Sequence, residues 1–130
     1  MAADYLSEQV VERGMVVVCS RWTKETRQES TMQYLVIAYD ATDDKALDRR
    51  FAARERHLET VTRLKAEGRA LYGAAILDEQ GTMRGSMLVV DFDNREELDR
   101  YLASDPYVTG KVWEKIEVRP CRVPELFLIT

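Results

Sequence analysis

The pattern of apolar and polar positions becomes regular from about residue 34 onward. Residues 34–39 form a continuous apolar run, Tyr-Leu-Val-Ile-Ala-Tyr, that ends at Asp40, which is typical of a strand buried on both faces. Residues 46–67 contain no Gly or Pro and are followed by Gly68, so they predict one long helix with a glycine after its last turn. The side of this helix expected to face the core carries Leu47, Phe51, Leu58, Val61 and Leu64.

A hairpin is predicted after this helix. Residues 69–77 and 85–92 are rich in apolar, strand-forming residues, and the second segment contains Met-Leu-Val-Val without alternation. Between them, the sequence Asp-Glu-Gln-Gly at residues 78–81 has the composition of a turn. The second strand of the hairpin is therefore expected, like residues 34–39, to be buried on both faces.

A second helix and a last strand complete the regular part of the chain. Asn94 and Glu97 have the spacing of a capping box. They predict a helix that ends near Ser104, because Asp105 precedes a proline and that position disfavours helical backbone. Residues 112–120 alternate between apolar and polar side chains, which favours a strand at the edge of the sheet.

The predicted order of elements is strand, helix, strand, strand, helix, strand. This is the order of the ferredoxin-like α+β fold, with an antiparallel four-stranded sheet. The first and third strands are central in that fold, in agreement with their apolar character. Two helices cover only one face of such a sheet, and an apolar opposite face would be an unusually large exposed patch. We therefore expect a homodimer in which two sheets pack face to face.

The two ends of the chain fit this pattern less well. Residues 1–31 combine a weak helical pattern at residues 5–11 with a following apolar segment and a polar stretch. They are predicted to be an N-terminal extension, dispensable for the core, to a domain at residues 32–130, and Met32 is a candidate natural start. The apolar residues 126–129 are too few to form a unit, so they are expected to pack against another surface.

Composition and charge narrow the class of protein. With 130 residues, of which 45% are hydrophobic and 32% charged, the chain has the make-up of one globular domain. Its net charge of -4 lacks the basic surplus of nucleic-acid-binding proteins. Its apolar runs are far shorter than the roughly 18 residues of a membrane span, and its N-terminus lacks the basic start of a signal peptide. We expect a cytoplasmic protein with no nucleic-acid or membrane partner.

No metal or cofactor is expected. Cys19 and Cys121 are far apart in the sequence and have no metal-ligand spacing, so both are predicted to be reduced thiols. The presence of a single histidine, His57, argues against a zinc site built by one chain. The sequence also contains no phosphate-binding loop and no dinucleotide-binding fingerprint.

Several short motifs resemble one known family. These motifs are Arg54-Glu55-Arg56-His57-Leu58, Glu67-Gly68-Arg69-Ala70-Leu71 with Gly73, Gly85-Ser86, Asp105-Pro106-Tyr107, Lys111-Val112-Trp113-Glu114 and Val118-Arg119-Pro120. They cover residues 34–121 and resemble the YciI-like (YCII-related) family. The resemblance implies a dimeric α+β barrel with a candidate active site made of His57 and Asp105, with Arg54, Ser86 and Tyr107 nearby. One branch of the family resembles a dehydrochlorinase of chlorinated hydroxyquinones, which needs acid-base chemistry and no cofactor.

The two central candidates each have a structural alternative. His57 lies three residues after Arg54 and so on the same side of the predicted helix. Its imidazole suits acid-base catalysis because both protonation forms are available near neutral pH, but it could equally be a half-buried histidine with one structural partner. Asp105 could orient that imidazole, or it could only cap the turn at Pro106 and Tyr107.

The remaining candidates are expected to bind substrate. Arg54, if it points inward, suits a carboxylate or an enolate oxygen. Ser86 lacks a surrounding Gly-x-Ser-x-Gly elbow, so it is predicted to be a hydrogen-bond donor and not a nucleophile. We predict a small cofactor-independent lyase or isomerase that acts on a small acidic or phenolic molecule, with His57 as base and Asp105 as its partner. The alternatives are a non-catalytic module that binds a small ligand and a structural homodimer.

Overall fold

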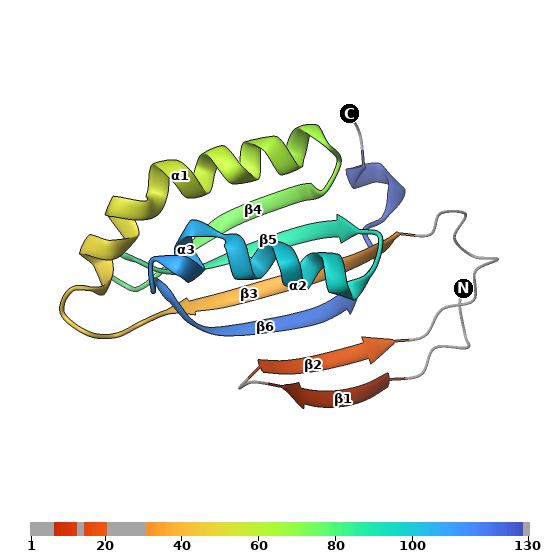
Figure 1. Ribbon diagram of the computed structural model, residues 1–130, viewed down its shortest axis with the longest axis horizontal. Coiled ribbons are helices and arrows are strands. Elements are labelled where there is room, and N and C mark those ends of the chain that lie inside the picture. The colour runs from red at the N-terminus through yellow and green to blue at the C-terminus, as the bar shows by residue number, and fades with distance from the viewer. Residues whose placement is uncertain (1–6, 13–14, 21–30, 129–130) are drawn as a thin grey trace.

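The computed structural model describes residues 7–12, 15–20 and 31–128 (Figure 1). Its elements are β1 (Ser7–Glu12), β2 (Met15–Ser20), β3 (Met32–Asp40), α1 (Ala46–Ala66), β4 (Ala70–Leu77), β5 (Met83–Phe92), α2 (Arg95–Ser104), α3 (Pro106–Thr109), β6 (Trp113–Cys121) and a 3-10 turn at Glu125–Phe127. From β3 to β6 the long elements follow the predicted order, and the short helix α3 is added after α2. The predicted ferredoxin-like α+β fold is confirmed.

The four predicted strands form an antiparallel sheet in the order β6-β3-β5-β4. Val36, in the middle of β3, pairs with Leu88 of β5 on one side and with Val118 of β6 on the other. The two long apolar runs of the sequence are therefore the two central strands, as predicted.

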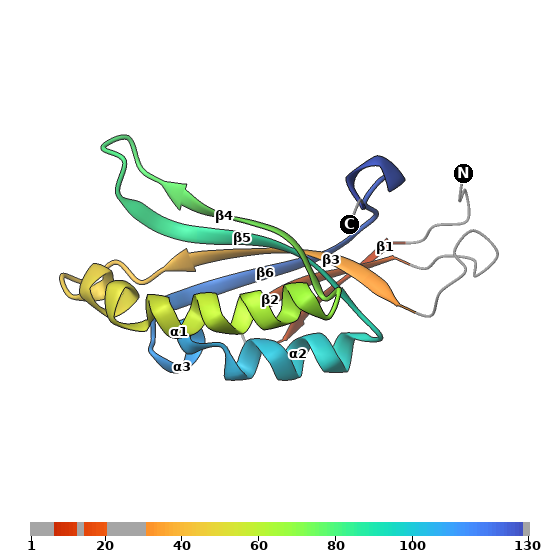
Figure 2. The same ribbon diagram turned by 90° about the horizontal axis from the view of Figure 1, so that it is seen from above.

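Both long helices lie on one face of this sheet (Figure 2). Alternate residues of β3, including Tyr34 and Val36, are buried there against the apolar side of α2. On the opposite face Leu35 and Ile37 are only partly buried, and Tyr39 is exposed. The predicted burial of the central strands on both faces is thus not met within a single chain.

The first two strands differ from the prediction. Residues 7–12 form β1 and not a helical segment, and β1 pairs antiparallel with β2. β2 in turn runs parallel to β6, with Val17 opposite Val118. β6 consequently lies inside a six-stranded sheet, so its predicted edge position is wrong. The alternation of side chains along β6 shows only which face of the strand is polar. β2 pairs with β6 through backbone hydrogen bonds, and such pairing cannot be recognised from side-chain alternation.

Helix α1 turns a different side to the sheet from the one predicted. Its buried residues are Ala46, Arg50, Ala53 and His57. Leu64 packs against the core as expected, but Phe51 is 57% exposed and Leu58 is also exposed, so the predicted stripe is wrong at these two positions. Arg50 and His57 take the inner side because buried carboxylates pair with them there, which offsets the cost of burying polar groups.

The predicted helix ends agree with the structure. The Asn94 side chain accepts a hydrogen bond of 2.9 Å from the Glu97 amide at the start of α2, and α2 ends at Ser104. Gly68 follows the last turn of α1 with a φ of 79°. This left-handed conformation favours glycine over other residues.

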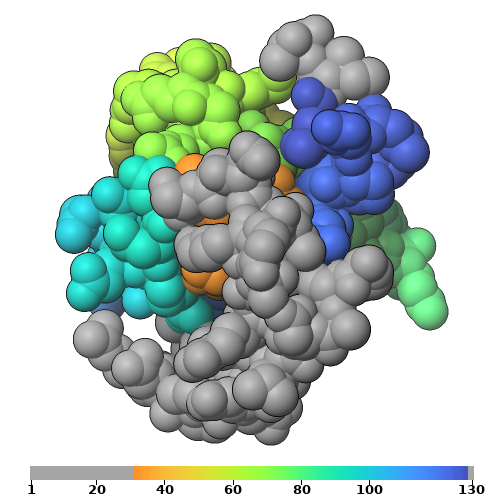
Figure 3. Space-filling view, turned by 90° about the vertical axis from the view of Figure 1, so that its right-hand side faces the viewer, coloured from red at the N-terminus to blue at the C-terminus, as the bar shows by residue number. Residues whose placement is uncertain are grey.

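The C-terminal segment projects from the surface on the sheet face opposite the helices (Figures 2 and 3). Leu126 and Phe127 of its 3-10 turn are both exposed, Phe127 by 69%. The surface against which residues 126–129 were expected to pack is therefore not supplied by the described part of the same chain, and Ile129 lies outside the described residues.

In the described ranges, no helix has the length and apolar character needed to cross a membrane. The division into an extension at residues 1–31 and a domain at residues 32–130 stays a prediction. The same holds for the cytoplasmic location.

Candidate active site

Two elements far apart in the sequence bring His57 and Asp105 together. His57 lies on the inner side of α1, and Asp105 is the residue between α2 and α3. The Nδ1 atom of His57 is 2.8 Å from Oδ1 of Asp105 and 3.1 Å from Oδ2. The two residues predicted as a pair are therefore in direct contact within one chain.

Asp105 is fully buried and accepts hydrogen bonds from two further groups. The Tyr101 hydroxyl donates to Oδ2, and the Tyr107 amide donates to Oδ1 at 2.8 Å, which caps α3. The sequence left capping and pairing with His57 as alternatives, and in the structure Asp105 does both. An ionised carboxylate can only accept, so Nδ1 of His57 carries a hydrogen and the neutral ring has its lone pair on Nε2.

Aromatic rings hold the imidazole of His57 in place. The Tyr107 ring stacks on it with the centroids 3.9 Å apart and the planes 14° apart. The Trp113 ring contacts it edge-on at a centroid distance of 5.6 Å. His57 is buried but borders a cavity, and its Nε2 atom has no hydrogen-bond partner among the residues that the structure describes.

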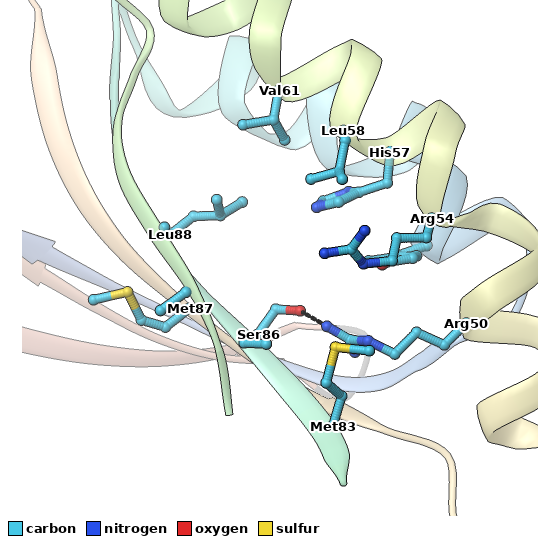
Figure 4. A pocket seen from close by; sticks show the side chains of 13 residues that line it. Arg50, Arg54, His57, Leu58, Val61, Met83, Ser86, Met87 and Leu88 are labelled. Atoms are coloured by element: carbon cyan, nitrogen blue, oxygen red, sulfur yellow. Dashed lines mark hydrogen bonds between the residues drawn. The ribbon is translucent and has the colours of Figure 1, made fainter. Parts of the chain in front are cut away.

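This cavity has a volume of about 310 Å3 and lies between α1 and the hairpin of β4 and β5. The hairpin curves away from α1, as Figure 2 shows, which leaves the space open. Four of the predicted site residues line it, namely Arg54, His57, Ser86 and Tyr107. Apolar side chains, including Leu58, Val61 and Leu88, form much of the remaining wall (Figure 4).

Arg54 reaches into this cavity from α1 (Figure 4). Its side chain makes no ion pair and no hydrogen bond with any described residue, and it is exposed. A guanidinium in this position presents several N–H donors and a fixed positive charge to a bound anion.

Arg50, one turn before Arg54, was missed by the sequence reasoning. Its Nη1 atom lies 2.8 Å from both carboxylate oxygens of Asp40, and its Nη2 atom donates to Ser86 Oγ at 2.8 Å. Arg50 and Asp40 are both buried. The available signal was spacing, because Arg50 precedes His57 by seven residues, or two helical turns, and so lies on the same side of α1.

Burial raises the pKa of three acidic groups around the site. For the Asp40 carboxyl, the hydrogen bonds and the charge of Arg50 oppose this effect without cancelling it. For the Tyr107 hydroxyl, burial raises the pKa while the positive charges of Arg50 and Arg54 oppose the rise. Burial, followed by the charge of Asp105, raises the pKa of Tyr101 well above its ordinary range. Both tyrosines therefore keep their protons at neutral pH, and Tyr101 donates a hydrogen bond to Asp105.

The described residues contain no group of three or more His, Cys, Asp or Glu side chains with the arrangement of a metal site. The polar side chains that line the cavity are instead one imidazole, two guanidiniums and two residues with hydroxyls, Ser86 and Tyr107. Such a set suits proton transfer and anion binding.

The family of the chain follows from its sequence match. The family model for the YCII-related domain matches residues 32–122. The chain belongs to the YCII-related family. An uncharacterized protein of Haemophilus influenzae is 34% identical over 95 residues, which cover 68% of this chain and 95% of the relative. Protein YciI of Escherichia coli is 30% identical over 95 residues, with the same coverage of 68% and 95%.

One solved structure is similar to this YCII-related chain over most of its length. It is that of a 5-chloro-2-hydroxyhydroquinone dehydrochlorinase from Burkholderia phenoliruptrix in complex with 2,5-dihydroxybenzoquinone. The TM-score is 0.62 at 20% sequence identity, and the match covers 73% of this chain and 98% of the dehydrochlorinase. The two proteins therefore share a fold.

Proposed function

We propose that this protein is a small cofactor-independent enzyme of the lyase or isomerase type, in which His57 transfers a proton and Asp105 orients it. The main support for this proposal is the orientation of the His57 imidazole. Nδ1 is bonded to the buried Asp105 carboxylate at 2.8 Å, whereas Nε2 has no partner in the described chain and the ring borders the cavity. A histidine with only a structural role would be expected to have its buried polar atoms satisfied by the protein.

The geometry gives each group a part in the reaction. Nε2 of the neutral imidazole accepts a proton from the substrate, and the Asp105 carboxylate stabilises the positive charge that then forms on the ring. The hydroxyl of Tyr101 and the amide of Tyr107 hold that carboxylate in place. Nε2–H then returns the proton to a leaving group or to another atom of the substrate. The first outcome is an elimination and the second is an isomerisation, and neither involves a net oxidation.

The cavity favours a small acidic or phenolic substrate. Its volume of about 310 Å3 is at the lower end for ligand pockets, and the apolar side chains of its wall suit a flat carbon skeleton. The guanidinium of Arg54, which has no partner among the described residues, suits a carboxylate or a phenolate oxygen. The name of the similar dehydrochlorinase, which refers to a hydroxyhydroquinone, supports a substrate of this class.

The proposal is tested by screening hydroxyquinones, lactones and small keto acids for turnover that depends on His57. His57→Ala should abolish proton transfer. Asp105→Asn should lower the rate by a large factor, because its amide can stabilise the wrong tautomer of the ring. Asp99→Asn, at a partly exposed carboxylate on α2, is the matched control and should keep the rate. Turnover that survives in His57→Ala would contradict the proposal, and binding without any turnover would favour a non-catalytic ligand-binding module.

Arg54 is tested against a neighbour on the same helix. Arg54→Ala should raise KM for an anionic substrate roughly tenfold or more, because it removes a charge-assisted hydrogen bond. Arg56→Ala is the control, since Arg56 is also exposed on α1 but does not line the cavity. Equal effects of the two changes would show that Arg54 acts only through the overall charge.

We also propose that the protein is a homodimer with sheet-to-sheet packing. The sheet face opposite the helices carries partly buried apolar residues, including Leu35, Ile37 and Val89, and the exposed C-terminal turn lies on the same side. A second copy that covers this face would bury both features. Light scattering at micromolar concentration should give twice the chain mass, and a stable monomer would rule the arrangement out.

A further inference from the structure

The hydroxyl of Ser86 has an unusual set of hydrogen-bond partners. Its Oγ atom accepts one bond of 2.8 Å from Nη2 of Arg50 and another of 3.2 Å from Nε1 of Trp113. A guanidinium and an indole N–H can only donate. Both bonds therefore use the Ser86 oxygen as an acceptor.

This arrangement determines what the Ser86 proton can do. A serine hydroxyl has two acceptor positions and one hydrogen, and Arg50 and Trp113 occupy both acceptor positions. None of the described residues accepts a hydrogen bond from Ser86, although the residue is only 5% exposed. Ser86 lines the cavity (Figure 4), so the cavity is the direction left for its O–H bond.

The surroundings of Ser86 strengthen it as a donor. The buried, positively charged guanidinium of Arg50 donates a hydrogen bond to the Ser86 oxygen, and Asp40 keeps that guanidinium in position. A hydroxyl that accepts two hydrogen bonds, one of them from a cation, becomes polarised and donates more strongly. His57 reaches into the same cavity from α1, whereas Ser86 reaches into it from β5 (Figure 4). The cavity thus has a proton acceptor, His57, on one wall and a hydrogen-bond donor, Ser86, on another.

We propose that Ser86, held as a donor by Arg50 and Trp113, binds the substrate oxygen that becomes negatively charged when His57 removes a proton. The substrate class is then a carbonyl or quinone compound with an acidic C–H next to the carbonyl, or a phenol. In the carbonyl case the C–H bond breaks and its proton goes to Nε2 of His57. The electron pair of that bond forms a C=C bond, and the carbonyl π pair moves to the oxygen that Ser86 holds. This assignment rests on the proposed function for the role of His57, whereas the donor role of Ser86 follows from its own contacts.

The donor is tested with 4-nitrophenol, because its phenol and phenolate forms have different absorption spectra. When bound to the wild-type protein and to His57→Ala, the probe should ionise at lower pH than in solution, since Ser86 donates to the phenolate oxygen. Ser86→Ala should reduce the preference for phenolate over phenol roughly tenfold, the effect of one hydrogen bond to a charged group. Thr62→Val removes an exposed hydroxyl on α1 and should leave the preference unchanged.

A second variant covers a failure of Ser86→Ala to fold, which could occur because Arg50 and Trp113 lose their acceptor. Ser86→Cys keeps a side chain of similar shape with a weaker donor, and it should reduce the phenolate preference several-fold. Unchanged preference in a folded Ser86 variant, or no binding of the probe by the wild-type protein, would overturn the inference.

The two proposals about this cavity can fail separately. Turnover that requires His57 but ignores Ser86 would overturn the donor role and leave the proposed function standing. Phenolate binding that depends on Ser86, in a protein without any His57-dependent turnover, would support the donor role and remove the catalytic proposal.

Discussion

The two long helices lie on the same face of the sheet but bury side chains of different kinds. Helix α2 buries Leu98, Tyr101 and Leu102 in the apolar core. Helix α1 buries Arg50 and His57 together with two alanines, and its larger apolar residues are mostly exposed or only partly buried. Apolar burial stabilises the fold mainly on the α2 side, whereas buried carboxylates hold the polar residues of α1. Helix α2 thus contributes mainly to the apolar core and helix α1 mainly to the candidate site, and the two helices meet at Asp105.

The largest effect is expected where a buried charge on the α1 side loses its partner. Arg50→Met should lower the free energy of unfolding by about 3–5 kcal/mol, because the buried Asp40 carboxylate is left unpaired. Arg49→Met is the matched control, since the neighbouring Arg49 pairs with an exposed Asp43 and surface ion pairs contribute little. Urea denaturation of both variants at neutral pH measures the difference. Similar losses would mean that the buried pair has no special role.

The loss in Arg50→Met should also depend on pH. Burial raises the pKa of Asp40 above 3.8 in the folded protein, so the folded state binds a proton more readily than the unfolded chain, and stability falls as the pH rises through the folded pKa. Removal of Arg50 raises this pKa further. The penalty should therefore be full at neutral pH and shrink toward pH 4. With Arg49 present, its hydrogen bonds lower the pKa of Asp43 to about 2, and Arg49→Met returns this pKa toward its ordinary value. The effect of the control change therefore titrates below about pH 4, and no such recovery is expected above it.

On the α2 side, a large loss is expected from an apolar truncation. Leu98→Ala should lower the free energy of unfolding by about 3 kcal/mol, because Leu98 is fully buried and its removal leaves a cavity. Phe51→Ala on α1 removes a larger but exposed side chain and should cost about 0.5 kcal/mol or less. The same urea experiment ranks the two. A loss at Phe51 as large as that at Leu98 would contradict the comparison of the helices and would point to a buried partner surface over Phe51.

Where the two helices meet, a smaller effect is expected from Tyr101→Phe. The change removes one hydroxyl donor from the buried Asp105 carboxylate and should cost about 1–2 kcal/mol. It should also lower any His57-dependent rate, because Asp105 becomes less well fixed. Tyr39→Phe, on the open face of the sheet, should change neither the stability nor the rate. An unchanged rate in Tyr101→Phe would confine Tyr101 to a structural role.

The smallest effect is expected from removing the N-terminal extension. A shortened chain that begins at Met32 keeps β3 to β6 and all of the described core residues, so its thermal midpoint should stay within a few degrees of that of the full chain. Calorimetry of both chains measures the shift. A drop of 10 °C or more would show that the pairing of β2 with β6 is integral to the fold.

The sequence predicted the apolar strands and helix α2 better than the buried polar side of helix α1. Long apolar runs and a capping box report local backbone preference directly, and they predicted β3, β5 and the start of α2 at Asn94. The orientation of α1 was predicted wrongly because Phe51 and Leu58 have the right spacing for a core stripe. Only the tertiary partners Asp40 and Asp105 show why Arg50 and His57 are inside instead, and those contacts have no local signal.

Only part of the candidate site was predicted, again because tertiary contacts have no local signal in the sequence. The family resemblance indicated His57 and Asp105, and the structure places them in contact. Capping and pairing at Asp105 could not be separated in the sequence because both use the same carboxylate. The role of Trp113 beside Ser86 was missed, since a tryptophan at the start of a strand is first of all a core residue.

The dual use of Asp105 links the order of α3 to the position of the His57 ring. One carboxylate both caps α3 and holds the imidazole, while the Tyr101 hydroxyl donates to it from α2. Opening of this single turn of helix removes one of these two further donors, so the proposed orientation of His57 depends on the free energy of that opening. Hydrogen exchange at the Tyr107 amide, whose proton is bonded to Asp105, would measure that free energy.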